Sequence, residues 1–560
     1  MNIDSHTLED LLVLPKHITK KQFGDALEYA KKEHIPPEQA LVKKGFISDE
    51  NLSRTIADYL DYHFIDLRQV KVSENCLTLL PEVVARAQQT VFYGKTGTDT
   101  LKVATTNTDN YEFLKLLEKK TGKKIDVYYT TQAGIDVALK YYKGDLRKRT
   151  DELIEKCEHN QQEGDVVALV DLLLEYAYDS QASDIHIEPL EENVSIRFRV
   201  DGLLHEAATY SRTLHEKIAF RIKIMARLQT DEHGAAQDGR FNVCISHTSF
   251  DVRVSFIPVT YGENIVMRLL ASHAEHLSLR DLGLQDADLQ KVVKASGKPH
   301  GMILAVGPTG SGKTTTLYTI LQFLNKPEVN IMTIEDPLEY DIDHVQQTQV
   351  NSKKDLTFAT GLRSIVRQDP DIIMVGEIRD EETADIAINA AMTGHLLLST
   401  LHTNDAATTF PRLIEMQIEP FLVSSSVHVI IAQRLVRKIC EGCRKSYRLT
   451  TRETGMIRRS PKVFDYIKKL TGKEALSGLR LYKGAGCKLC NETGFRGRTG
   501  VFEVLEVSEV IRVLIAQKAT ASVINQKALE EGMTPLLFDG LFKAVSGITT
   551  LEEVMKTVHG

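Results

Sequence analysis

The sequence predicts an α/β protein whose larger, C-terminal part is built on a mostly parallel sheet and follows two smaller α+β domains. Three observations support this prediction. The length of 560 residues corresponds to about three to five domains at ~100–200 residues each. Between 165 and 275, period-two alternation of apolar residues indicates antiparallel hairpins. After 276, apolar strand-like runs alternate with helical patterns, as a parallel α/β sheet requires.

The composition excludes several classes of protein. Lys and Arg number 69 against 76 Asp and Glu, a net charge of −7, which argues against a surface made mainly for nucleic acid. Hydrophobic residues at 42% and charged residues at 26% exclude a disordered or collagen-like chain. The first residues lack the basic-then-apolar order of a signal peptide, and no apolar run reaches the ~18 residues that span a bilayer. We therefore expect a cytoplasmic protein that meets a membrane only through partners.

Residues 1–145 are expected to form a small α+β domain. Strand-like runs at 101–104 and 125–128 lie between helical patches. Gly45 is expected to end one helix, and Ser48 is placed to cap the next.

The segment 146–164 is rich in charged residues, which indicates a linker or an exposed helix. The next domain, 165–275, contains two turn signals. Asp201 and Gly202 stand between two apolar-alternating runs, a strong hairpin signal. A second strand pair is expected to flank a turn at 261–264.

A glycine-rich loop at 307–314 follows the apolar run 302–306 and precedes apolar residues at helical spacing. It matches G-x-x-x-x-G-K-[ST] in the strand–loop–helix context that this pattern requires, and the alternative is a glycine-rich surface turn. Backbone N–H groups of such a loop surround phosphate oxygens, Lys313 neutralises the outer phosphates, and the Thr314 hydroxyl can bind Mg²⁺. The predicted ATP-binding residues are Gly307, Pro308, Thr309, Gly310, Ser311, Gly312, Lys313, Thr314 and Thr315.

Acidic and histidine side chains follow further strand-like runs. Glu335 and Glu339 lie at one strand end, and Glu377 lies at another. Carboxylates beside a nucleotide can bind Mg²⁺ or orient the attacking water, although a solvated loop is the alternative. His395 and His402 flank an apolar strand and could contact the γ-phosphate, although a lone histidine is more often structural.

Four of the seven cysteines form two C-x-x-C pairs, Cys440 with Cys443 and Cys487 with Cys490. Each pair can place two thiolates on one tetrahedral Zn²⁺. The 43 residues between the pairs exceed the usual gap in zinc ribbons, so an inserted subdomain at about 438–500 must bring them together. With all four positions filled by protein, the predicted zinc is structural.

These segments together resemble the secretion-superfamily ATPases that power type II secretion and type IV pilus assembly. The resemblance is strong over about 165–555. Besides the phosphate loop, it rests on TIEDPLEY at 333–340, VRQDPDIIMVGEIRD at 366–380, TGHLLLSTLHTN at 393–404, ASDIHIEP at 182–189, QDGR at 237–240 and GENIVMRLL at 262–270.

The resemblance implies a RecA-like P-loop NTPase domain at 276–560, preceded by a PAS-like α+β domain at 165–275. Within it, Glu377 would hold Mg²⁺ through water, and Glu339, ranked above Glu335, would polarise the attacking water. His395 and His402 would form the histidine pair of the family.

The same resemblance implies that Arg253 and Arg268 reach the nucleotide as charge-stabilising arginines, with Arg240 a weaker candidate. The alternative is that they are strand-face arginines in ordinary ion pairs. Some relatives bind cyclic di-GMP through an Arg-Leu-Gly motif in the first domain. Residues 36–38 are Pro-Pro-Glu instead, so we expect 1–145 to dock on a partner rather than to bind a cyclic dinucleotide.

The function implied by the resemblance is a homohexameric ATPase at the inner membrane. It would act on a membrane platform protein, next to a pilus or secretion component, to insert pilin or pseudopilin subunits. The cysteine quartet and the extra N-terminal domain favour assembly over retraction. Two alternatives remain: a nucleic-acid translocase of a conjugation or DNA-uptake system, which the acidic balance disfavours, and a regulatory nucleotide-binding module with little turnover.

Overall fold

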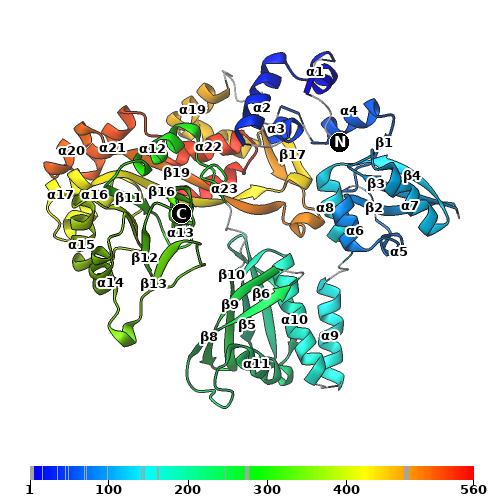
Figure 1. Ribbon diagram of the computed structural model, residues 1–560, viewed down its shortest axis with the longest axis horizontal. Helices are drawn as coiled ribbons and strands as arrows, with labels where there is room; N and C mark the ends of the chain where they lie inside the picture. Colours follow the sequence, from blue (N-terminus) through cyan, green and yellow to red (C-terminus); the bar gives the residue numbers. More distant parts are fainter. Residues whose placement is uncertain are drawn as a thin grey trace. The chain divides into compact units, whose positions relative to one another are not determined.

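A computed structural model describes residues 5–559 except 16, 34–35, 44–45, 48, 69, 71, 98, 141, 143–145, 161–162, 246–247, 271–276 and 472–478. The chain divides into two compact units, one of residues 1–176 and 486–492 and one of residues 177–485 and 493–560 (Figure 1). The predicted helix end at Gly45 and cap at Ser48 lie outside the described residues.

The first unit begins with four helices packed around buried Leu8, Phe23, Leu41 and Ile56. They are α1 (Ser5–Val13), α2 (Lys20–Glu33), α3 (Pro37–Lys43) and α4 (Asp49–Tyr59). A four-stranded sheet of order β1-β4-β3-β2 follows. Its strands are β1 (His63–Phe64), β2 (Thr90–Thr96), β3 (Thr100–Thr105) and β4 (Lys124–Tyr129), accompanied by α5 (Glu74–Leu77), α6 (Glu82–Gln88), α7 (Tyr111–Thr121) and α8 (Gln132–Lys140). The strands predicted at 101–104 and 125–128 are therefore confirmed.

The charged segment that follows is helical. Helix α9 spans Leu146–Asn160, and its buried residues Leu146, Thr150, Ile154 and Cys157 recur at helical spacing. Helix α10 spans Glu163–Asp179, so the expected domain boundary at 164–165 falls inside a helix. The charged residues of α9 lie on its solvent face. Composition alone therefore could not distinguish a linker from an exposed helix.

The second unit contains a six-stranded antiparallel sheet of order β7-β6-β5-β10-β9-β8 with helix α11 (Arg212–Ala226). Its strands are β5 (Ala182–Pro189), β6 (Asn193–Val200), β7 (Leu203–Ser211), β8 (Gln237–Ile245), β9 (Thr248–Val259) and β10 (Gly262–Leu270). The hairpin at Asp201 and Gly202 is confirmed, with φ of 49° and 88° at the two residues. The prediction of a turn at 261–264 is wrong. Gly262 already pairs with Val259, so the two strands are joined by a tight turn at residues 260–261.

A seven-stranded sheet of order β13-β12-β14-β15-β11-β16-β19 forms the core of the ATPase region, parallel except for β19. The strands are β11 (Gly301–Val306), β12 (Ile331–Glu335), β13 (Val345–Gln349), β14 (Ile372–Val375), β15 (Leu396–Leu401), β16 (Val427–Ile439) and β19 (Phe495–Glu506). This confirms the predicted mostly parallel α/β architecture.

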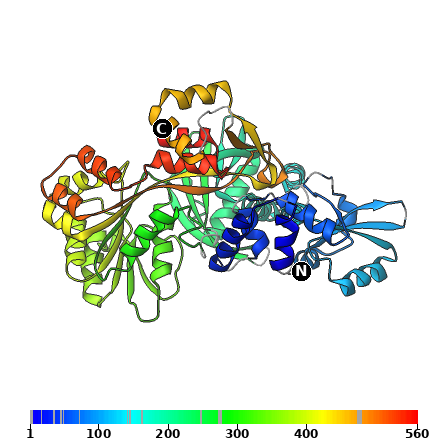
Figure 2. The same cartoon turned by 90° about the horizontal axis from the view of Figure 1, so that it is seen from above.

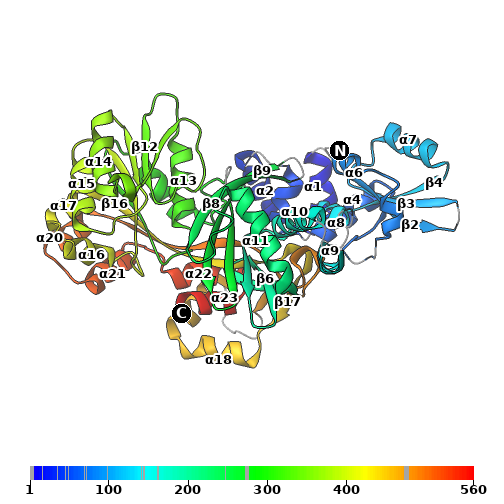
Figure 3. The ribbon, with the colours of Figure 1, turned by 90° about the horizontal axis from the view of Figure 1, so that it is seen from below.

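Helices cover both faces of this sheet (Figure 2, Figure 3). One apolar core contains α12 (Asp286–Ser296) and α13 (Lys313–Leu324). The core on the other face contains α14 (Phe358–Ile365), α15 (Glu381–Met392), α16 (Thr409–Glu415), α17 (Pro420–Ser426), α20 (Glu509–Ala516) and α21 (Ala521–Glu530). Both faces of the central strands are therefore buried, as their continuous apolar sequences predict.

An insertion separates the two longest strands of this sheet. It contains β17 (Arg444–Arg448), α18 (Thr451–Arg459), α19 (Pro461–Thr471) and β18 (Arg480–Gly484). Two C-terminal helices, α22 (Leu536–Val545) and α23 (Leu551–His559), complete the unit. None of the described helices combines the length and apolar character that a bilayer span requires.

Candidate functional site

The register of the parallel strands gathers the predicted ATP-site segments at one edge of the seven-stranded sheet. Val306 pairs with Leu401, and Val375 pairs with Ser399, so β11, β14 and β15 end together. The carboxyl end of β12 lies beside that of β14. The loop 307–314 therefore meets the segments that follow the other three strands, where ligands of open α/β sheets bind.

Glycine is required at two positions of this loop. Gly307 and Gly312 have φ of 147° and 87°. A Cβ atom would lie 2.6 Å from the Gln433 carbonyl at Gly307, and 2.7 Å from Gln433 Nε2 at Gly312. The loop thus lies directly against strand β16, with its N–H groups at the start of α13.

Lys313 and Ser311 have side chains that could bind a phosphate group. Lys313 Nζ donates to the carbonyl oxygens of Gly307 at 2.8 Å and Pro308 at 3.1 Å, and burial lowers its pKa. Ser311 Oγ is buried without a hydrogen-bond partner in the described chain. A phosphate would supply an acceptor to the serine and a counter-charge to the lysine, so these residues fit ATP. Thr314 is partly exposed at the first turn of the helix, where its hydroxyl can reach a Mg²⁺ ion.

Glu377 lies at the end of β14 between two donors. Its Oε1 is 2.6 Å from Arg379 Nη2, and its Oε2 is 3.2 Å from His402 Nε2. The Glu377 carboxylate also interacts electrostatically with Lys313. The predicted acidic residue and one of the predicted histidines therefore meet near the phosphate loop, and Arg379 joins them as a residue that the motif reading did not single out.

His395 is not brought to this site. It precedes the first residue of β15, at the opposite edge of the sheet from His402, and its Nδ1 lies 2.9 Å from the Ala390 carbonyl. A strand rises about 3.3 Å per residue, so roughly 20 Å separates the two histidines. The prediction that both histidines act on the nucleotide is corrected for His395, because His395 precedes the first residue of β15 and His402 follows its last.

The two glutamates after β12 lie in different environments. Glu335 is 2% exposed, and it accepts hydrogen bonds from Thr333 Oγ1 at 2.6 Å, Gln347 Nε2 at 3.2 Å and the Tyr318 hydroxyl. Burial raises the pKa of Glu335. Glu339 is partly exposed, and no hydrogen bond to its carboxylate is recorded within the described chain. The carboxylate of Glu335 is therefore held inside the protein, whereas that of Glu339 is accessible to water.

Two residues of β16 support the loop and were not singled out from the sequence. Gln433 is 2% exposed; its Nε2 donates to Ser311 O at 2.8 Å, and its Oε1 accepts from Thr316 Oγ1 at 2.7 Å. Arg434 Nη2 donates to the Asn404 carbonyl at 3.0 Å. The strand thus connects the phosphate loop to the segment after His402. The polar pair Gln-Arg directly after the apolar run 429–432 is the signal that could have identified them.

The three predicted arginines form a row across the six-stranded sheet. Arg240 on β8 is directly opposite Arg253 on β9, and Arg253 is opposite Arg268 on β10. Directly opposite residues project from the same face with Cβ atoms about 4.5–5.5 Å apart, and like charges there repel. Arg253 Nη2 donates to the Leu338 carbonyl, next to Glu339. A polyphosphate is the kind of anion that would relieve this repulsion.

Asp184, in the ASDIHIEP segment, continues the row on β5. It is 4% exposed, and its Oδ1 accepts from Arg268 Nε at 2.9 Å. This hydrogen bond raises the pKa of Arg268, and Glu339 contributes electrostatically in the same direction. Arg199, opposite Asp184 on β6, has its Nε 3.6 Å from Asp184 Oδ2. Asp184 therefore orients Arg268, a role that cross-strand register reveals and sequence spacing does not.

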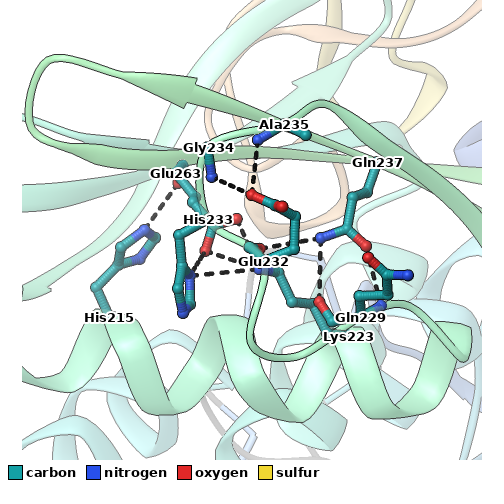
Figure 4. Close-up of polar contacts among 9 residues, drawn as sticks. All are labelled: His215, Lys223, Gln229, Glu232, His233, Gly234, Ala235, Gln237 and Glu263. Carbon is teal, nitrogen blue, oxygen red and sulfur yellow. Dashed lines mark hydrogen bonds and ion pairs between the residues drawn. The ribbon is translucent and has the colours of Figure 1, made fainter.

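A buried ion pair holds the segment that leads into β8 and Arg240 (Figure 4). Lys223 on α11 is fully buried, and its Nζ lies 2.7 Å from Glu263 Oε1 and donates to the Glu232 carbonyl at 2.7 Å. His233 Nδ1 is 2.8 Å from Glu263 Oε2. Burial disfavours a charged Glu263, but hydrogen bonds from Lys223 and His233 outweigh it and lower the pKa of Glu263. Residues 232–233 are thereby fixed to α11 and β10.

Lys223→Met is expected to lower the free energy of unfolding by about 3–5 kcal/mol, because it leaves the Glu263 carboxylate buried without its main partner. The wild-type contribution of Glu263 should be complete above its unfolded pKa of ~4.3 and should be lost as pH falls through its lower folded pKa. Urea unfolding at pH 7 and pH 3 measures both effects. Lys217→Met, on the same helix but partly exposed, is the control; equal losses in the two variants would contradict the assignment.

The four cysteines of the C-x-x-C pairs lie together. The Sγ atoms of Cys440, Cys443, Cys487 and Cys490 are all within 4.8 Å of one another, and Cys487 Sγ is 3.7 Å from Cys490 Sγ. A tetrahedron with Zn–S distances of about 2.3 Å has S···S separations of ~3.8 Å, so the donor set fits Zn²⁺. Three of the four are buried, and four cysteine ligands would fill every position of a tetrahedral ion, as in structural zinc sites.

Native protein is expected to contain about one zinc per chain, and Cys490→Ser to lose it together with more than ~4 kcal/mol of the free energy of unfolding. Elemental analysis of dialysed protein and chemical denaturation measure the two quantities. Cys244→Ser is the control because Cys244 is exposed. Native protein without stoichiometric zinc would contradict the assignment.

Comparison with known proteins places this chain in a family. Residues 159–556 match the family described as Type II/IV secretion system protein, and residues 60–149 match the MshEN domain. The type II secretion system ATPase E of Vibrio cholerae is 46% identical over 397 residues, which cover 71% of this chain and 76% of that protein. The type IV pilus assembly ATPase PilB of Myxococcus xanthus is 37% identical over 569 residues, covering 98% of both chains.

Among solved structures, the X-ray structure of the Legionella pneumophila ATPase DotB matches with a TM-score of 0.51 and covers 70% of this chain and 95% of its own. Its identity of 22% limits this likeness to the fold. The family match covers the arginine row, the phosphate loop and all four clustered cysteines. The chain therefore belongs to the type II/IV secretion system protein family, and it is an ATPase.

Proposed function

We propose that this ATPase assembles pilin or pseudopilin subunits by acting, as a homohexamer, on a platform protein of the inner membrane. The observation that carries the proposal is the match along 98% of both chains to a type IV pilus assembly ATPase, which includes the N-terminal region. The similarity to a type II secretion ATPase over 71% of the chain supports the same class of motor. The net charge of −7 disfavours the alternative of a nucleic-acid translocase.

In the proposed mechanism, the phosphate loop binds ATP, with Lys313 turning from the Gly307 and Pro308 carbonyls to the outer phosphates. Thr314 and, through water, Glu377 would hold Mg²⁺, and the ion would supply positive charge to the phosphates. His402 and Arg379 orient Glu377. Glu339 polarises the attacking water, whereas Glu335 supports the strand from within the core.

The arginine row supplies the remaining positive charge in this proposal. Arg253 and Arg268 contact or approach the 338–339 segment of the same chain, so movement of the six-stranded sheet can deliver or withdraw them. An arginine placed on a γ-phosphate can contribute about 10³–10⁵ in rate. Opening and closing of the two sheets would thus be tied to hydrolysis, and this motion would be passed to the membrane partner.

The N-terminal domain is proposed to dock on a component at the cytoplasmic face of the membrane. Its match to the MshEN domain covers 60–149. The Pro-Pro-Glu at 36–38 lacks the arginine and glycine of the cyclic di-GMP motif, so docking is retained as its role. The protein would then be peripheral to the membrane through its partners.

Crosslinking in native membranes followed by purification of the tagged full-length chain tests this function. A membrane platform protein with pilins is expected for a pilus motor, and a platform protein with a secretion complex for a type II motor. The Lys313→Ala variant, trapped without turnover, should retain the same partners. Recovery of DNA-processing proteins without a platform protein would overturn the proposal.

A further inference from the structure

A cavity of about 360 Å³ lies at the edge of the seven-stranded sheet opposite the phosphate loop. Its walls come from α12, the segment before β11, the end of β19, the start of α20, and the end of α21 with the residues that follow it, among them Glu531. Because β19 is antiparallel, its last residues, near Glu506, lie beside the first residues of the parallel strands. The volume falls in the range of small-ligand sites, and the proposed motor gives this cavity no role.

Four cations line this cavity, and three of them have carboxylate partners. Lys291 Nζ lies 2.8 Å from Asp288 Oδ1, and Lys294 Nζ lies 2.7 Å from Glu506 Oε1. Arg512 Nη1 is 3.2 Å from an oxygen of Glu509, whose side chain is 87% exposed. An ion pair with so exposed a partner is weak, so the guanidinium can exchange this partner for a ligand.

Lys298 is the fourth cation, and its recorded partner is neutral. His428 Nε2 lies 2.8 Å from the His300 carbonyl, which can only accept, so Nε2 carries the proton. Nδ1 is then the acceptor for Lys298 Nζ at 3.1 Å. Burial lowers the pKa of His428, which keeps this ring uncharged.

Within the part of the chain that the structure describes, Lys298 is therefore in contact with a neutral ring and not with a carboxylate. Burial, reinforced by the nearby Arg512 and Lys294, lowers the pKa of Lys298, while Glu506 and Glu509 act in the opposite direction. Lys298, Lys294 and Arg512 line one concavity together with the carboxylates of Glu506, Glu509 and Glu531. A phosphate group would contact all three cations by replacing Glu506 and Glu509 as the partners of Lys294 and Arg512.

We propose that this cavity binds a phosphate-bearing anion, with Lys298, Lys294 and Arg512 as its ligands. Ammonium and guanidinium groups around a concave site are the usual partners of phosphate oxygens. The three named cations stand on three separate segments, so an occupant would tie α12 and α20 to the residues that precede β11.

Strand β11 connects the cavity to the ATP-site edge of the sheet. Lys298 lies three residues before Gly301, the first residue of β11, and the same strand ends at the phosphate loop. Gly301 has φ of 113°, and a Cβ atom there would lie 2.2 Å from His428 Nε2. The partner of Lys298 thus packs directly against the start of this strand. We infer that the occupant is regulatory rather than a second substrate for hydrolysis.

Equilibrium dialysis of the full-length chain with radiolabelled pyrophosphate tests the site at constant ionic strength. Lys313→Ala weakens the phosphate loop, so the remaining binding reports the cavity. About one site per chain is expected in Lys313→Ala. Adding Lys298→Met or Arg512→Gln should weaken it at least ~10-fold, whereas Lys326→Met, an exposed lysine on the same domain, should not change it. No binding in Lys313→Ala, or equal binding in all variants, would overturn the proposal.

Competition identifies the source of the phosphate group. Displacement of bound pyrophosphate by ADP indicates a nucleotide. Displacement by phosphatidylglycerol vesicles but not by phosphatidylcholine vesicles indicates a lipid headgroup. Displacement by neither ADP nor vesicles indicates free phosphate. A second test needs no substitution: after labelling with pyridoxal 5′-phosphate and borohydride, pyrophosphate should protect Lys298 but not the exposed Lys326. Equal protection of the two lysines, or protection of neither, mapped by mass spectrometry, would also overturn the site.

Discussion

Glu339→Gln is expected to lower kcat for ATP hydrolysis by about 10²–10⁴-fold, because an amide cannot take a proton from the attacking water. The partly exposed Glu339 carboxylate lies in the segment that Arg253 contacts, and Tyr318 accepts a weak hydrogen bond at 3.4 Å from the backbone N–H of Glu339. The substitution changes neither the size of the side chain nor any hydrogen bond recorded for it. The affinity for ATP should therefore stay within about a factor of three, while phosphate release falls.

Glu335→Gln separates this role from that of its buried neighbour. Glu335 is enclosed by Thr333, Tyr318 and Gln347, so its variant should lose stability as well as activity. Asp341→Asn, on an exposed residue two positions after Glu339, should leave both quantities unchanged. If Glu339→Gln kept wild-type kcat while Glu335→Gln alone abolished turnover with stability intact, the assignment of the two glutamates would be reversed.

The double variant Arg253→Ala/Arg268→Ala is expected to lower kcat by ~10³–10⁵-fold with ATP binding preserved, because the phosphate loop remains complete. The physical reason is the placement of two cations in one cross-strand row that faces the Glu339 segment. Asp184→Asn should give a smaller loss, since it removes the acceptor that orients Arg268 but keeps both arginines.

Fluorescent-nucleotide binding and phosphate release, measured on the same assembled protein, distinguish a catalytic from a binding defect. Arg212→Ala is the matched control, because Arg212 is exposed on α11 and donates to the Glu191 and Tyr261 carbonyls. Unchanged turnover in the double variant would remove the arginine row from the mechanism and leave these residues as ordinary strand-face cations.

Much of this site could be predicted from the sequence, because local chemistry defines it. The phosphate loop, the two acidic strand ends and the paired cysteines each consist of residues close together in the chain, and strand–loop–helix context fixes their conformation. The parallel alternation of strands and helices then places the strand ends at one edge without knowledge of side-chain contacts. Glu377 and His402 therefore meet as their positions after β14 and β15 imply.

The remaining features depend on strand register and packing, which spacing does not encode. His395 and His402 belong to one motif but lie at opposite ends of β15. The alignment of Arg240, Arg253 and Arg268 follows from pairing across three strands. Gln433 supports the phosphate loop from β16, more than 100 residues later in the chain. Each of these relations is a long-range contact, so only the fold reveals it.

Phosphate release from saturating ATP by the full-length chain, with and without DNA, tests the central claim of an ATP-driven assembly motor most directly. The wild type should hydrolyse ATP at a rate that DNA does not change, and Lys313→Ala should lose this activity by at least ~10²-fold, because the outer phosphates lose their buried cation. Hydrolysis that DNA stimulates strongly, or a Lys313→Ala rate equal to that of the wild type, would contradict the account.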